Sequence, residues 1–141
     1  MRFMMLMIPK GYENAAPGTM PDPGAFAAMA KYNESLRKAG VLLALGGLHP
    51  PSLGIRVSFE DGKATVTDGP FTEAKEVIGG YWMIQVKSKE EAIQWACRCP
   101  ASPNEVIELR QVMEFTEFPR DMQELAAQYP EMAQFRSPGG K

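Results

Sequence analysis

Two short segments of this chain, residues 3–8 and 41–45, are hydrophobic at every position, and this limits the folds that the chain can adopt. Residues 3–8 have apolar side chains in both sets of alternate positions. The sets are Phe3, Met5 and Met7 on one side and Met4, Leu6 and Ile8 on the other. Successive side chains of a strand point to opposite faces, so a strand of this kind is buried on both. Residues 41–45 have the same pattern, and any fold must therefore cover both faces of the sheet.

Two segments with helical spacing lie between the strand-like segments. Residues 23–39 carry apolar side chains at i, i+3 and i+4, and Gly40 follows as a stop signal. The expected buried side chains are Phe26, Met29, Ala30 and Leu36. A second helix is expected after the capping box formed by Ser88 and Glu91, and it ends before Pro100. Its expected buried face consists of Ile93, Ala96 and Cys97.

Further strands are expected at residues 55–59, 64–67, 81–86 and 106–112. Asp61-Gly62 predicts a tight hairpin turn, and the alternation of Ile55, Val57 and Phe59 with polar residues predicts a half-buried strand. The order is β-α-β, a hairpin, β-α-β and a C-terminal helix. It predicts an α+β fold of ferredoxin-like βαββαβ type with an inserted β-hairpin.

The helices of such a fold cover only one face of its sheet. Because the strands are apolar on both faces, we expect two copies to pack sheet to sheet as a homodimer, a dimeric α/β-barrel. We expect residues 1–116 to form the α+β domain. Residues 117–141 are expected to form a C-terminal helix and a flexible tail.

Charge and cysteine spacing exclude several classes of protein. The formal net charge is −2, from 15 basic and 17 acidic residues, so we expect neither a nucleic acid nor a membrane as partner. The apolar run near the N-terminus stops at Pro9, too early for a signal peptide or a membrane span. Cys97 and Cys99 lack the CxxC spacing and are expected to be buried or half-buried free thiols in a cytoplasmic protein. The chain has 1 histidine and no glycine-rich phosphate motif, so we expect no metal and no cofactor.

One segment resembles a known family. Asp68-Gly69-Pro70-Phe71 is followed by Glu73, Lys75-Glu76 and Gly79-Gly80-Tyr81-Trp82. Together with the element order, these residues resemble the signature of the DGPF-domain family, a branch of the YCII-related proteins. The resemblance runs from the first strand to about Met113. It implies a dimeric α/β-barrel of ferredoxin-like subunits. Members of the family are sometimes encoded near, or fused to, sigma-factor-type transcription regulators. The wider group of relatives includes a few enzymes that act on small molecules.

The resemblance also bears on the catalytic residues. In the YCII branch, a histidine on the first helix and an aspartate near the DGPF position are thought to form an active-site pair. The first predicted helix here has no histidine, and the only one is His49, after the second strand. We therefore consider His49 and Asp68 as the catalytic pair, with the carboxylate orienting the imidazole as a general base.

The remaining candidates are ligand-binding residues. Arg56 or Lys75 would hold an anionic group of the ligand, and Phe71 and Tyr81 would line its pocket. Each also has a purely structural explanation: the DGPF segment alone satisfies a turn, with Asp at its start, Gly at positive φ, Pro to restrict φ and Phe as an anchor. The charged side chains fit a solvated surface equally well.

Two functions are compatible with this pattern, and whether the protein is an enzyme stays open. The first is binding of a small molecule, aromatic or carboxylated, in a cleft near Asp68 and His49, with cofactor-free acid/base catalysis. The second is a non-catalytic accessory or interaction module linked to transcription regulation.

Overall fold

The computed structural model describes residues 1–135, with side chains described as far as Met132, and it confirms the α+β class. Four strands form one antiparallel sheet of order β2-β5-β1-β6, and two further strands form a separate hairpin. The sheet strands are β1 (Arg2–Ile8), β2 (Leu42–Gly47), β5 (Gly80–Gln85) and β6 (Val106–Gln111). The hairpin strands are β3 (Ile55–Glu60) and β4 (Lys63–Asp68), and the helices are α1 (Pro23–Lys38), α2 (Lys89–Cys97) and α3 (Arg120–Ala126). The tail predicted at residues 137–141 lies outside the described residues.

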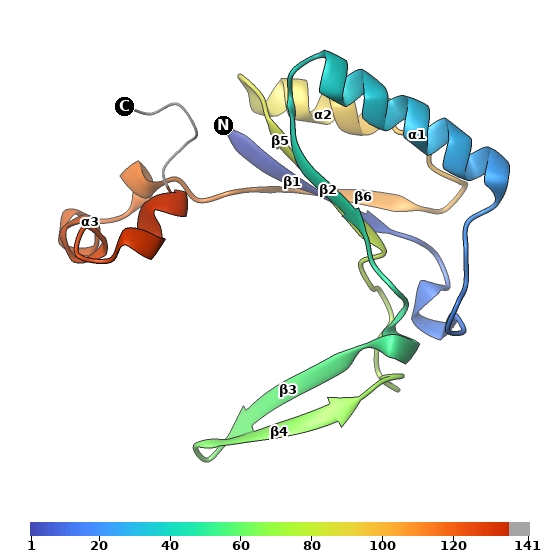
Figure 1. The fold of residues 1–141 in the computed structure, drawn as a ribbon, viewed down its shortest axis with the longest axis horizontal. Helices are drawn as coiled ribbons and strands as arrows, with labels where there is room; N and C mark the ends of the chain where they lie inside the picture. Colours follow the sequence, from blue (N-terminus) through green and yellow to red (C-terminus); the bar gives the residue numbers. More distant parts are fainter. Residues whose placement is uncertain (136–141) are drawn as a thin grey trace.

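Helices α1 and α2 lie on the same side of the sheet (Figure 1). Phe3, Met5 and Met7 of β1 face them and are buried, whereas the alternate residues of β1 face the other side and are half-buried. On the neighbouring strand, Trp82 and Ile84 are buried in the same core. Within the single chain, the predicted burial of both faces of the sheet therefore holds only for the helix side.

The buried faces of both helices match the predicted ones in part: Leu36 is buried as predicted, and Met29 and Ala96 are partly buried against the core. Tyr32 and Leu36 are the buried residues of α1, while Phe26 is 65% exposed. In α2, Ala92 and Trp95 are buried and Ile93 is 42% exposed. Spacing alone identifies several neighbouring stripes on a helix, and the stripe that is buried here contains the large aromatic side chain, which buries the most apolar area. The expected burial of Ala30 and Cys97 is wrong for the same reason, and both are exposed.

The predicted signals at Gly40 and Ser88 are present at the helix ends, and Asp22 adds a cap at the start of α1 that was not predicted. Asp22 accepts a hydrogen bond from the Ala25 amide at 3.1 Å at the start of α1, and Gly40 has φ of 73° after its end. Ser88 accepts from the Glu91 amide at 3.1 Å, as predicted for the capping box. The Glu91 carboxylate, however, accepts from the amide of Lys87 at 2.8 Å instead of from Ser88.

The hairpin formed by β3 and β4 projects from the sheet on the side away from the helices (Figure 1). Its turn is the predicted one, with φ of 50° at Asp61 and 75° at Gly62. The prediction that β3 is half-buried is wrong for the single chain, because every residue of both strands is exposed. One face of the hairpin is still apolar, since Val57 pairs with Val66 and Phe59 pairs with Ala64. The residues of β2 are also less buried than predicted, with Leu43 42% and Leu45 44% exposed.

The two free thiols differ in environment. Cys97 is exposed at the end of α2, and Cys99 is half-buried against the core. Burial, with a smaller contribution from the Glu105 carboxylate, raises the pKa of Cys99 to about 11.

We therefore expect iodoacetamide to alkylate Cys97 first. The thiolate is the reactive form, so Cys99 should react at least about tenfold more slowly at neutral to mildly alkaline pH. Mass spectrometry of peptides separated at Arg98 measures both rates. In urea the two rates should converge; equal rates in the folded protein would show that Cys99 is not shielded.

Candidate functional site

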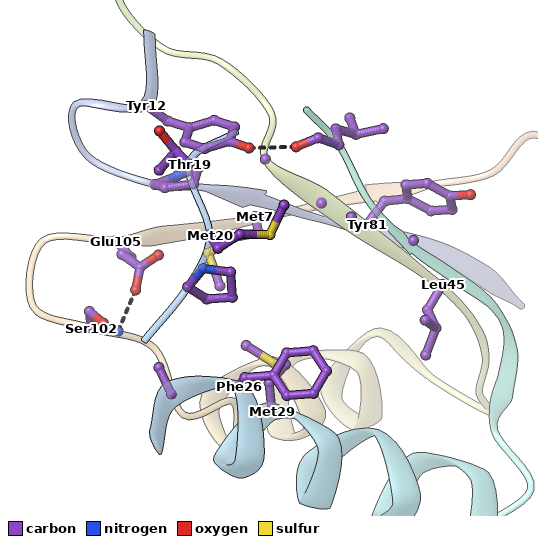
Figure 2. A pocket seen from close by; sticks show the side chains of 18 of the residues that line it. Met7, Tyr12, Thr19, Met20, Phe26, Met29, Leu45, Tyr81, Ser102 and Glu105 are labelled. Atoms are coloured by element: carbon purple, nitrogen blue, oxygen red, sulfur yellow. Dashed lines mark hydrogen bonds between the residues drawn. The ribbon is translucent and has the colours of Figure 1, made fainter. Parts of the chain in front are cut away.

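A cavity of about 720 Å³ lies at one end of the sheet, between its helix-covered face and the first half of α1 (Figure 2). The ends of β1, β2 and β5, the loop at residues 9–22 and the loop at residues 100–105 complete its walls. Its main apolar side chains are Met7, Met20, Phe26, Met29, Leu45 and Trp82. Its polar side chains are Tyr12, Thr19, Asp22, Asn33, His49, Ser102 and Glu105.

The loop at residues 9–22 forms one wall because it is bonded to the rest of the protein. The Tyr12 hydroxyl donates to the Leu48 carbonyl at 2.6 Å, and the Ser52 hydroxyl donates to the Ala15 carbonyl at 2.9 Å. Pro9 packs so closely on Gly79 that a Cβ there would lie 2.6 Å from the Pro9 ring. These contacts hold the long loop beside the segment that follows β2.

Trp82 and Asn33 meet at the inner wall of the cavity. The Trp82 indole N–H donates to Oδ1 of Asn33 at 2.7 Å. The Tyr32 ring contacts Trp82 edge-on, with 5.9 Å between centroids and an interplanar angle of 85°, and its hydroxyl donates to the Trp95 carbonyl at 2.6 Å. Burial raises the pKa of Tyr32, so this phenol stays protonated and keeps donating. The inner wall is thus built from ordered, mutually packed side chains.

His49 is the one predicted catalytic residue that lines the cavity. It is exposed, and it directly precedes Pro50, which is fully buried, and the 3₁₀ turn η2 (Pro51–Leu53). Asp68 is exposed at the end of β4, opposite Ile55, and does not line the cavity. Among the described residues, no hydrogen bond or ion pair joins His49 to Asp68.

The DGPF segment closes the base of the hairpin. The Gly69 amide donates to the Gly54 carbonyl at 2.8 Å, and the Gly69-Pro70 peptide bond is cis. A Cβ on Gly69 would collide with the Pro51 carbonyl oxygen and lie 2.9 Å from its carbon. The prediction that Gly69 is required for positive φ is wrong: its φ is not in that region, and the glycine is required by this close approach.

Arg56 and Phe71 contact each other rather than the cavity. The Arg56 guanidinium carbon lies 3.9 Å from the centroid of the Phe71 ring, a cation–π contact at the hairpin base. Phe71 also packs on Gly54, where a Cβ would lie 3.2 Å from the ring. Lys75 is exposed and does not line the cavity.

Tyr81 contributes to the cavity wall at the strand end, but its side chain points to the opposite face of the sheet from Trp82. Its ring lies over Gly46, where a Cβ would be 2.9 Å from it, and it is turned away from Phe26 and Met29 (Figure 2).

Asn33 is a cavity residue that motif reasoning missed. The signal that identifies it is an amide within an apolar helical stripe, because Met29 and Leu36 lie on the same side of α1 at i−4 and i+3. Glu105 and Tyr12 come from loops, and no sequence spacing connects them with the helix.

Among residues 1–135, no group of three or more His, Cys, Asp or Glu side chains is arranged to hold a metal ion. In the same part of the chain, no helix has the length and apolar character needed to cross a membrane.

The family model described as the YCII-related domain matches residues 1–116. Curated proteins contain no sequence that matches this chain.

Proposed function

Because this chain belongs to the YCII-related domain family, we propose that it binds a small, largely apolar molecule in the cavity between α1 and the sheet. The observation that carries the proposal is the cavity itself. Its volume of about 720 Å³ suits a small organic ligand, and its walls combine apolar side chains with a few polar groups, as ligand sites do. Arg56 and Lys75 are outside these walls, so the proposed ligand does not depend on either as an anion clamp.

We propose further that His49 supplies acid/base chemistry at the cavity mouth. An imidazole changes protonation near neutral pH and is suited to proton transfer there. Asp68 is its candidate partner, because the neighbouring Gly69 packs on Pro51, two positions after His49.

A non-catalytic accessory module, of the kind linked to transcription regulators, is the second candidate. It is favoured by the DGPF residues, whose contacts at the hairpin base serve structure, and by the lack of a hydrogen bond between His49 and Asp68. The change His49→Gln distinguishes the two candidates. Under the catalytic proposal it abolishes turnover of a bound compound with little change in its affinity, whereas an accessory module turns over no compound in either form.

A thermal-shift screen of small metabolites tests the binding proposal. We expect at least one compound to raise the melting temperature of the wild-type protein, and the rise to be lost in Ala25→Trp, because Ala25 lines the cavity and an indole there occupies it. A hundredfold excess of ligand over its Kd stabilises a protein by about 2.7 kcal/mol, which is readily detected.

The matched control is Ala27→Trp, an equally large change at an exposed position of α1 that does not line the cavity. It should keep the ligand-induced shift. A compound that stabilises the wild type, Ala25→Trp and Ala27→Trp equally binds elsewhere, and that result would reject the cavity as its site.

We also propose that the subunit is ferredoxin-like, of the DGPF branch, and pairs with a second copy through the open sheet face. Strand order β2-β5-β1-β6 with helices on one side supports the topology. The open face carries half-buried Met4, Leu6 and Met83, and the neighbouring hairpin presents an apolar face with Phe59 80% exposed. Apolar surface on both the sheet and the hairpin supports a partner that covers them together.

A further inference from the structure

We infer that Asn33, held in place by Trp82, is a polar anchor in the cavity, and that the cavity selects ligands that carry a hydrogen-bond acceptor and no negative charge. This inference rests on the proposed binding function and specifies the class of ligand.

The orientation of the Asn33 amide follows from the chemistry of its partner. An indole N–H can only donate, so the Asn33 atom that lies 2.7 Å from it is the oxygen. The NH₂ group therefore points away from Trp82. No protein acceptor among the described residues bonds to this NH₂ group, and no buried side-chain nitrogen or oxygen in that part of the chain lacks a partner. The NH₂ group is thus accessible, on a residue that lines the cavity, and offers its two N–H donors to a ligand.

The anchor is held rigidly before any ligand arrives. Trp82 is 5% exposed, and its ring is held edge-on by Tyr32, which is itself 6% exposed. The Tyr32 hydroxyl is fixed by its bond to the Trp95 carbonyl at 2.6 Å. A donor that is already ordered loses little conformational entropy on binding, so its hydrogen bond adds to affinity and specificity.

The charge of the cavity walls sets the second requirement. Its carboxylates are Asp22 and Glu105, and no lysine or arginine lines it. Each carboxylate accepts one backbone N–H, from Ala25 at 3.1 Å and from Ser102 at 2.6 Å, and neither has a cationic partner in the cavity walls. An anionic ligand would meet two like charges without a cationic partner, whereas a neutral or cationic ligand would not.

An NMR titration with three matched probes tests this inference. The probes are para-methylbenzamide, para-methylbenzylamine and para-methylbenzoate, which share one apolar body and differ in charge and donor–acceptor pattern. The resonances of the Asn33 side-chain amide and the Trp82 indole N–H report binding at the anchor. We expect the amide to shift both resonances. The protonated amine has no acceptor for the Asn33 NH₂ group and should shift them less, and the carboxylate should bind at least tenfold more weakly than the amide.

The variant Asn33→Asp distinguishes the contribution of the Asn33 NH₂ group to binding from that of the rest of the cavity. Its carboxylate can still accept from Trp82, but it replaces the NH₂ donor with a charged acceptor. We expect para-methylbenzamide to lose about tenfold in affinity, the value of one hydrogen bond, and para-methylbenzylamine to bind as well or better. Asn14→Asp, the same change at an exposed position outside the cavity, should alter neither.

The outcomes distinguish failure of the inference about ligand class from failure of the proposed binding function. If para-methylbenzoate binds the wild-type protein as tightly as para-methylbenzamide does, the inference is overturned, but the cavity remains a binding site. This comparison uses only the wild-type protein, so it holds even if Asn33→Asp fails to fold. An unchanged amide affinity in a folded Asn33→Asp protein overturns it as well. If none of the three probes shifts a resonance of the cavity, both the inference and the proposed function fail.

Discussion

Replacing Gly69 with alanine is expected to loosen the base of the hairpin by about 2–3 kcal/mol, the usual cost of overpacking a tight site. The new methyl group would collide with the carbonyl oxygen of Pro51 and lie 2.9 Å from its carbon. Both are backbone atoms of η2, which cannot move away as the end of a flexible side chain can. The hydrogen bond from the Gly69 amide to the Gly54 carbonyl, 2.8 Å in the native protein, must then lengthen or break.

Amide hydrogen exchange measures this effect where it occurs, because the hairpin is joined to the sheet only at its base. We expect exchange of the residue-69 amide to accelerate by about 30- to 150-fold, the equivalent of that free energy. Gly47→Ala is the control, since a Cβ there meets nothing within 4 Å. Exchange as slow in Gly69→Ala as in the wild type would mean that the close approach to Pro51 is not what requires glycine.

Changing Leu6 to glutamate is expected to separate the proposed dimer. Leu6 lies on the open sheet face between Tyr81 of β5 and Glu108 of β6. In a C2 dimer packed on this face the new carboxylate is buried twice, each time near an existing carboxylate. An unpaired buried charge costs about 2–5 kcal/mol, so the dissociation constant should rise at least about a hundredfold.

Sedimentation equilibrium of wild type and Leu6→Glu measures the change. Ile93→Glu, which places the same charge on the outer surface of α2 at a site 42% exposed, should remain dimeric. Phe59→Glu tests the hairpin, and because Phe59 is 80% exposed this change should leave the fold of the single chain intact. A wild-type protein that is monomeric at micromolar concentration, or a Leu6→Glu protein that dimerises as tightly as wild type, contradicts the proposed interface.

The positions of the secondary structure elements were largely predictable because local signals specify them. Gly40 follows the end of α1, Ser88 begins α2, and Asp61-Gly62 forms the hairpin turn. Burial was less predictable, because it depends on what packs on each face. The pattern of β3 is apolar at alternate positions, yet nothing within residues 1–135 of the single chain buries it. Likewise, the face of α2 that packs on the sheet contains Trp95 and not Ile93. Which face packs depends on the sheet and cannot be read from the helix sequence alone.

The candidate site was predictable in part. His49 was identified because it is the only histidine, and it lines the cavity. Asn33 was not, because an amide on a helix has no motif and acquires its role only from the indole that orients it. Phe71 and Arg56 formed part of the predicted pocket, but they contact each other at the hairpin base, a pairing across the inserted hairpin that no linear spacing reveals.

A crystal structure of the protein with the compound that gives the largest thermal shift tests the central claim most directly. We expect electron density for that compound between α1 and the sheet end, in contact with Asn33 and close to His49. Density for the compound on the open sheet face or the hairpin, with only solvent in the cavity, would contradict it.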